Sequence, residues 1–171
     1  MSLGFVLIRL LHILLGAFWA GTLISNALFL APAIGEAGPD GAKVMAGILR
    51  RRFLDVMPIV ALLTILTGVW LYWRISGGFD PGWSRSPIGM AYGVGGILAI
   101  VAFGTGVGVL RPAMLRIPKL AGEAAQAKDP AAREALTAQI AGLRRRSTTA
   151  GRIVALLLAL ATGFMAVARY L

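Results

Sequence analysis

The residues best suited to chemistry are a single histidine and its neighbours in the first apolar run. His12 is the only histidine in 171 residues, and the stretch from Arg9 to Pro32 around it is otherwise almost wholly apolar. An ionisable residue in such a run is rare and indicates function by default. Arg9, Gly16 and Trp19 recur around His12 at helical spacing, which predicts one shared helix face. Because neutral imidazole is the commonest protein metal ligand, His12 is a candidate ligand.

Two methionines are predicted at a similar depth on other helices. His12 lies roughly 12 Å along the axis from the outer end of its helix. Met90 is near the outer start of the third apolar run, and Met165 is near the outer end of the fourth. A histidine with a thioether can hold haem iron axially or bind Cu(I). Arg9 is then a candidate partner for a haem propionate, and the Trp19 ring is a candidate to line one side of the cofactor site.

The same residues also have a structural interpretation, which the sequence leaves open. A lone histidine in a membrane can donate a hydrogen bond to a neighbouring helix, where polar contacts hold helices together. Methionines in apolar helices are usually packing residues. Thr64 and Thr67, in the second apolar run, are predicted to form hydrogen bonds between helices.

Composition predicts that these residues lie in a membrane protein. Hydrophobic residues make up 58% of the chain and charged residues 14%, against roughly 25% charged in soluble domains. The net charge of +10 does not indicate nucleic acid, because the basic residues flank the apolar runs as the positive-inside rule describes. The absence of cysteine excludes disulfides and thiolate metal sites.

The apolar runs predict four transmembrane helices in one domain over 1–171. Their expected ranges are about 3–31, 56–74, 87–110 and 147–168. Pro32 and Arg111-Pro112 are expected to end the first and third helices. The first run is too long for a signal-peptide core of roughly 7–15 residues, so we expect a retained helix. The predicted fold class is therefore an all-α membrane protein, an up-and-down four-helix transmembrane bundle.

Two basic segments are predicted to lie on the cytoplasmic surface as amphipathic helices. They cover about 41–53 and 130–146. Thirteen of the 17 Lys and Arg residues lie in the two loops that contain these segments or, for Arg152, in the adjoining first turns of the fourth run. This predicts that both termini face outward from a bacterial inner membrane. Basic faces of this kind favour anionic lipids, at about 1 kcal/mol per residue near the surface.

Glycines in the third run permit close helix packing. Gly89/Gly93 and Gly104/Gly108 have the G-x-x-x-G spacing, which favours packing or dimerisation, so a homo-oligomer or a subunit of a larger complex is expected. A groove cleared for a flat cofactor or a lipid is the alternative. No carboxylate pair lies within the apolar runs, and no phosphate loop is present. The sequence thus gives little indication of an enzyme.

The first run resembles a known group of membrane proteins. Leu11-His12 followed by Trp19-Ala20-Gly21 resembles the first helix of the CopD-like copper-resistance proteins and of the related HemJ family. Phe29-Leu30-Ala31-Pro32 is similar to the segment that ends this helix in HemJ. The resemblance implies a four-helix membrane fold with haem b on His12. HemJ is associated with protoporphyrinogen oxidation, but Ala33 and Ile34 replace its arginine and second histidine, so the oxidase activity is not carried over.

Two functional hypotheses follow. In the first, His12 binds haem b, or alternatively copper, for electron transfer or redox chemistry; any enzyme activity would be that of a haem-dependent oxidoreductase. In the second, the chain is a cofactor-free structural or accessory subunit of a larger membrane complex.

Overall fold

The chain folds entirely into helices, four of them long and apolar. The computed structural model describes residues 2–171. Four helical runs are long and apolar enough to cross a membrane: Leu3–Glu36, Phe53–Ile75, Pro87–Gln126 and Pro130–Tyr170. This confirms the prediction of an all-α chain with four candidate membrane spans.

Each run contains one or more helices. The first consists of α1 (Leu3–Ser25), a π-helical turn (Asn26–Leu30) and α2 (Ala31–Glu36), and the second is α4 (Phe53–Ile75). The third consists of α6 (Pro87–Thr105), a π-helical turn (Gly106–Leu110) and α7 (Arg111–Gln126), and the fourth is α8 (Pro130–Val167) with a 3₁₀ turn (Ala168–Tyr170). Two short helices, α3 (Gly38–Arg50) and α5 (Pro81–Ser84), join them.

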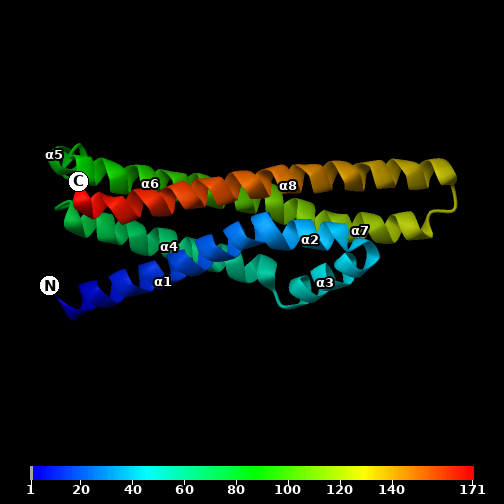
Figure 1. The fold of residues 1–171 in the computed structure, drawn as a ribbon, viewed down its shortest axis with the longest axis horizontal. Coiled ribbons are helices and arrows are strands. Elements are labelled where there is room, and N and C mark those ends of the chain that lie inside the picture. The colour runs from blue at the N-terminus through cyan, green and yellow to red at the C-terminus, as the bar shows by residue number, and fades with distance from the viewer. Residues whose placement is uncertain (1) are drawn as a thin grey trace.

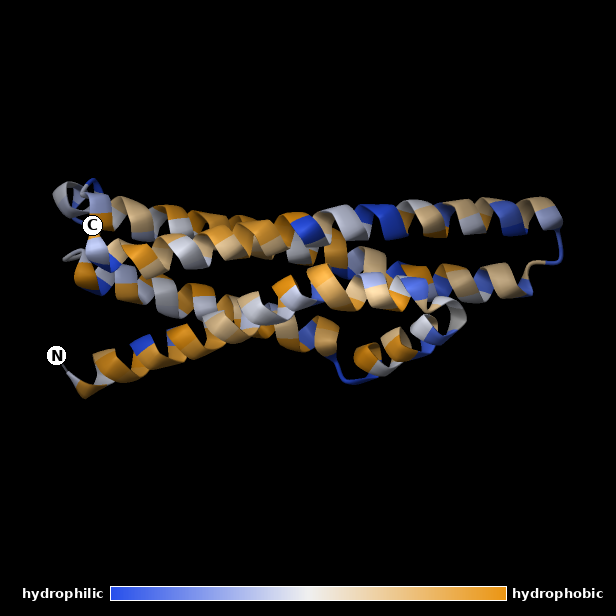
Figure 2. Ribbon diagram, in the orientation of Figure 1, coloured by the Kyte–Doolittle hydropathy of each residue, from blue (hydrophilic) through white to orange (hydrophobic). Residues whose placement is uncertain are grey.

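The four runs lie alongside one another and alternate in direction (Figure 1). Both termini and α5 lie at one end of the molecule, and the α7–α8 hairpin projects beyond the other helices at the opposite end. Apolar residues dominate the half that contains the termini, whereas the α7–α8 hairpin is markedly more polar (Figure 2). Hydropathy is therefore divided along the length of the molecule.

The prolines expected to end the first and third helices do not end them. Before Pro32, the Ala31 N–H bonds five residues back, to the Asn26 carbonyl. Before Pro112, the Arg111 N–H bonds in the same way to the Gly106 carbonyl. Proline lacks the N–H and crowds the carbonyl of the preceding turn. A wider π turn gives the ring room, so each helix continues past its proline.

The segment boundaries also differ from those expected at the polar end. The predicted segment 130–146 and the predicted fourth helix 147–168 form one continuous helix, α8, because nothing between them interrupts it. Asp129 caps its start, accepting from the Ala131 and Ala132 N–H groups at 3.2 Å. The predicted segment 41–53 corresponds to α3, and Arg52, with φ of 60°, separates it from α4.

The core consists mainly of small side chains. Trp19, Val154 and Leu158 are its largest buried members, and alanines fill most of the rest. Helices α6 and α8 approach so closely that a Cβ at Gly95 would lie 3.1 Å from the Ala161 carbonyl oxygen. Large apolar side chains such as Ile97 face outward instead. Small residues inside and large apolar ones outside are typical of helices packed in lipid.

Candidate functional site

His12 lies at the interface between α1 and α4. Its Nδ1 is 2.9 Å from the Thr64 carbonyl oxygen and 3.2 Å from Thr67 Oγ1. The Thr67 hydroxyl in turn donates to the Leu63 carbonyl at 2.7 Å. The imidazole is half-buried. His12 therefore joins the first and second apolar helices through a hydrogen bond, as the structural interpretation predicts.

This contact fixes the tautomer of His12. A carbonyl oxygen can only accept, so the proton of the neutral ring must lie on Nδ1 and be donated to Thr64. Nε2 then carries a lone pair, and no hydrogen bond to it occurs among residues 2–171. Metal-binding histidines almost always donate their other ring N–H to a carboxylate, backbone carbonyl or water. His12 has this arrangement.

Two glycines make room for the interface. An ideal Cβ at Gly68 would lie 2.8 Å from His12 Cε1 and 3.4 Å from Nδ1, so the imidazole lies against the bare backbone of α4. One turn further along α1, a Cβ at Gly16 would meet Thr64 Cγ2 at an ordinary 3.5 Å. Only glycine at position 68 allows the ring to reach the Thr64 carbonyl in this geometry.

Arg9 and Trp19 occupy contrasting environments on α1. Arg9, about one turn from His12, is exposed and forms no ion pair among the described residues. Trp19 is only 3% exposed and belongs to the core with Ala61 and Leu158. Arg9 is therefore free to meet an anionic group, whereas Trp19 packs the inside of the protein.

The two methionines lie on other helices. Met165 packs at the α6–α8 interface, where its Cγ would be 3.0 Å from a Cβ at Gly95. Met90, at the start of α6, is 53% exposed. The contacts of His12 are to α4, so the structure joins His12 to Thr64, Thr67 and Gly68 rather than to either thioether.

The donor set limits which group the site can hold. Within residues 2–171, no three His, Asp or Glu side chains come together in a way that could bind a bare metal ion. Haem iron needs only one or two axial ligands from the protein, because the porphyrin provides the others. A lone histidine with a free Nε2 fits haem b better than it fits a naked ion such as copper.

Sequence reasoning missed Gly68 and the role of the Thr64 backbone. Thr64 Oγ1 donates to the Val60 carbonyl of its own helix, so the bond between helices predicted for its side chain is wrong. Thr67 Oγ1 donates to the Leu63 carbonyl of its own helix and also lies 3.2 Å from His12 Nδ1, so its predicted bond between helices is confirmed. The shorter bond to His12 uses the Thr64 carbonyl, which no side-chain pattern reveals. The small residue at position 68 was the available signal, since a glycine in an apolar helix indicates close approach.

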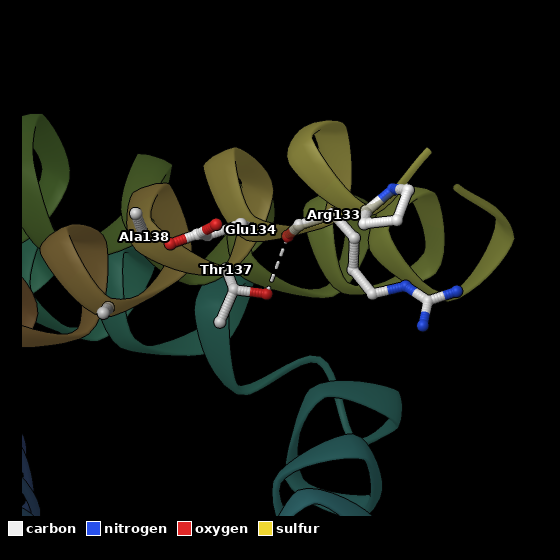
Figure 3. A pocket seen from close by; sticks show the side chains of 6 residues that line it. Arg133, Glu134, Thr137 and Ala138 are labelled. Atoms are coloured by element: carbon white, nitrogen blue, oxygen red, sulfur yellow. Dashed lines mark hydrogen bonds between the residues drawn. The ribbon is translucent and has the colours of Figure 1, made fainter. Parts of the chain in front are cut away.

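One hollow on the surface lies on α8, away from His12. A shallow depression of about 480 Å³ on α8 is lined by residues between Pro130 and Ala141 (Figure 3). Thr137 donates to the Arg133 carbonyl of its own helix at 2.9 Å, and the Arg133 side chain extends away from it. Because polar groups do not converge there, the depression has no features of a reaction site.

No protein-family model, curated protein or solved structure matches this chain. The case for function therefore comes from the residues and their geometry.

Proposed function

We propose that this chain is a multi-pass membrane protein that binds haem b through Nε2 of His12 and takes part in electron transfer. The observation that supports this is the hydrogen bond from Nδ1 to the Thr64 carbonyl, which leaves Nε2 as a free lone pair. Bound haem would supply one-electron redox chemistry. Copper is the second candidate, and it would need thioether ligands beside His12.

Residues of this chain would hold the group in distinct ways. His12 provides the axial nitrogen, and its bond to Thr64 orients the ring and raises the basicity of Nε2. Arg9 is exposed one turn away and suits a propionate. Because Met165 packs against Gly95 and Met90 is exposed at the start of α6, the arrangement favours a single protein ligand from each chain.

The proposal includes a membrane topology. The four apolar runs form an up-and-down transmembrane bundle in a bacterial inner membrane, with both termini outside. Helix α3 and the first half of α8 then lie at the cytoplasmic face as basic amphipathic segments. The weak likeness of the first helix to CopD-like and HemJ proteins supports the same topology. The clustered basic residues of α3 and of the first half of α8 favour anionic lipid.

The test is an absorption spectrum of the purified protein, oxidised and reduced with dithionite. We expect a Soret band and a reduced α-band in the wild type, lost in His12→Gly and restored when imidazole is added. Gly163→Ala is a suitable control, because a Cβ at Gly163 meets nothing within 4 Å. A featureless wild-type spectrum, with neither iron nor copper by elemental analysis, would refute the cofactor proposal.

An accessory subunit is the second candidate function, and one observation favours it. Ile97, Val101, Gly104 and Gly108 recur at helical spacing along α6 and the π-helical turn after it, and all four are exposed. A Cβ at Gly104 or Gly108 would meet nothing within 4 Å, so this G-x-x-x-G pair is not used inside the chain. Such a stripe lets another membrane helix approach closely. Loss of a co-purifying subunit on Gly104→Leu, with an unchanged spectrum, would favour this role.

A further inference from the structure

An open groove of about 650 Å³ runs between α7 and α8 in the polar half of the molecule. Arg116 and Lys119 line it from α7, and Arg145 and Arg146 line it from α8. Glu123 is the one carboxylate among its lining residues. Four cations and one carboxylate leave three positive charges uncompensated around a single groove. Its volume lies in the range of small-ligand sites.

The four cations have no partners of their own. Over residues 2–171, the side-chain ion pairs are Lys43 with Asp40 and Arg111 with Asp55. The groove cations belong to neither pair, and Glu123 is the one carboxylate among the lining residues that offsets their mutual repulsion. An anion placed among them would relieve this repulsion. Arginine suits phosphate in particular, since its planar guanidinium donates two parallel hydrogen bonds to phosphate oxygens.

The register of the two helices brings the arginines to one level. A Cβ at Gly151 would touch Leu110 Cδ2 at 4.0 Å, which makes these two residues neighbours across the pair. Because α7 and α8 run in opposite directions, Arg116, six residues after Leu110, is level with Arg145, six residues before Gly151. Arg146 is adjacent. Arg116, Arg145 and Arg146 therefore lie at one level along the helix pair, and all three line the groove.

That level lies just beyond the headgroup layer of a bilayer, within reach of an arginine side chain. Leu110 is the last apolar residue before Arg111, and six residues of helix add about 9 Å. The headgroup region extends roughly 5–8 Å beyond the hydrocarbon on each side. Long arginine side chains readily span the difference.

We propose that this groove is a binding site for the phosphate of an anionic phospholipid. The proposal rests on the membrane insertion proposed above but not on a cofactor at His12. It differs from a general attraction of basic surface to lipid, because the shape of the groove matters as well as its charge. Gly142 lines the groove and has nothing within 4 Å of its Cβ position, so it keeps the groove open.

The test measures lipid binding to the purified protein by native mass spectrometry in detergent. Phosphatidylglycerol is the probe, and phosphatidylcholine is the neutral comparison. Arg116→Gln/Arg145→Gln/Arg146→Gln should lower the apparent affinity for phosphatidylglycerol by about tenfold or more. The matched control removes three charges elsewhere at the same end, as Arg50→Gln/Arg51→Gln/Lys128→Gln, and should keep most of the affinity.

A second pair of variants tests shape without altering charge. Gly142→Leu should weaken phosphatidylglycerol binding by filling the groove. Gly122→Leu, also in open space but not lining the groove, should leave phosphatidylglycerol binding unchanged.

Equal losses of phosphatidylglycerol affinity in the two triple variants, or no effect of Gly142→Leu, would overturn a defined site. Equal competition by soluble glycerol phosphate would overturn the lipid as its source. Normal lipid selectivity in His12→Ala would separate this site from the haem proposal.

Discussion

The hydrogen bond between His12 and the Thr64 carbonyl contributes little to stability by itself. Polar contacts between membrane helices average about 0.6 kcal/mol, with a maximum near 1.7. An apolar residue at position 12 would avoid placing an imidazole in a hydrocarbon environment. Stability alone is therefore a weak reason for this histidine and its matched Gly68, whereas an oriented ligand nitrogen is a strong one.

The fit of His12 against Gly68 predicts a specific coupling between the two positions. Gly68→Ala should lower the free energy of unfolding by about 1–3 kcal/mol, because the new Cβ would lie 2.8 Å from His12 Cε1. In a His12→Ala background, Gly68→Ala should leave the free energy of unfolding unchanged. Thermal or denaturant unfolding in detergent over the double-mutant cycle measures this.

Gly163→Ala provides the control for helix propensity. A Cβ at Gly163 meets nothing within 4 Å, so this change should be neutral or should stabilise by about 0.5–1 kcal/mol. If Gly68→Ala costs as much without His12 as with it, the ring does not set the spacing between α1 and α4.

At the scale of the elements, hydrophobic runs predict the helices well and their ends poorly. Four apolar runs were enough to predict four long helices. The prediction that Pro32 and Pro112 end the first and third helices was wrong, because a π turn before each proline allows the helix to continue. A π turn has no simple residue signature, so the sequence alone favours the more common outcome, a helix end.

The glycines of α6 show a similar limit. Helical spacing identified Gly89/Gly93 and Gly104/Gly108, yet among the glycines of α6 it is Gly95 that meets α8, where a Cβ would lie 3.1 Å from the Ala161 carbonyl oxygen. Gly89 instead makes room for the preceding loop, since its Cβ would lie 2.2 Å from the Trp83 carbonyl oxygen. Which glycine faces which neighbour depends on helix rotation, which spacing does not determine.

Substitutions at adjacent glycines test this packing. Gly95→Val should destabilise the protein by about 1–3 kcal/mol, because the backbone of α8 cannot move aside. Gly96→Val, whose Cβ has nothing within 4 Å, should have little effect. Melting temperatures of the purified variants distinguish them. Similar melting temperatures would mean that α6 and α8 do not approach at Gly95.

At the scale of the whole molecule, charge and hydropathy are arranged along one axis. Both termini lie at the apolar end, and the α7–α8 hairpin carries its basic residues at the other end (Figures 1 and 2). The sequence predicted this division from the positions of Lys and Arg. It could not predict the groove between α7 and α8, because that groove depends on the register of two helices joined by residues 127–129.

The proposed orientation can be tested with introduced cysteines, since the sequence contains none of its own. Arg85 is exposed near α5, at the end with the termini, and Lys128 is exposed at the tip of the α7–α8 hairpin. If basic loops stay in the cytoplasm, Arg85→Cys should react with a membrane-impermeant maleimide in intact spheroplasts. Lys128→Cys should react only after lysis.

Arg50→Cys, at the last residue of α3, is the matched control for the cytoplasmic side and should behave like Lys128→Cys. A reversed pattern, with Lys128→Cys and Arg50→Cys labelled in intact spheroplasts, would keep four crossings but invert the orientation. It would also place the α7–α8 groove outside the cell, facing the outer leaflet. Labelling of Arg85→Cys and Lys128→Cys from the same side would mean that the third apolar run does not cross the membrane, which would contradict the proposed bundle itself.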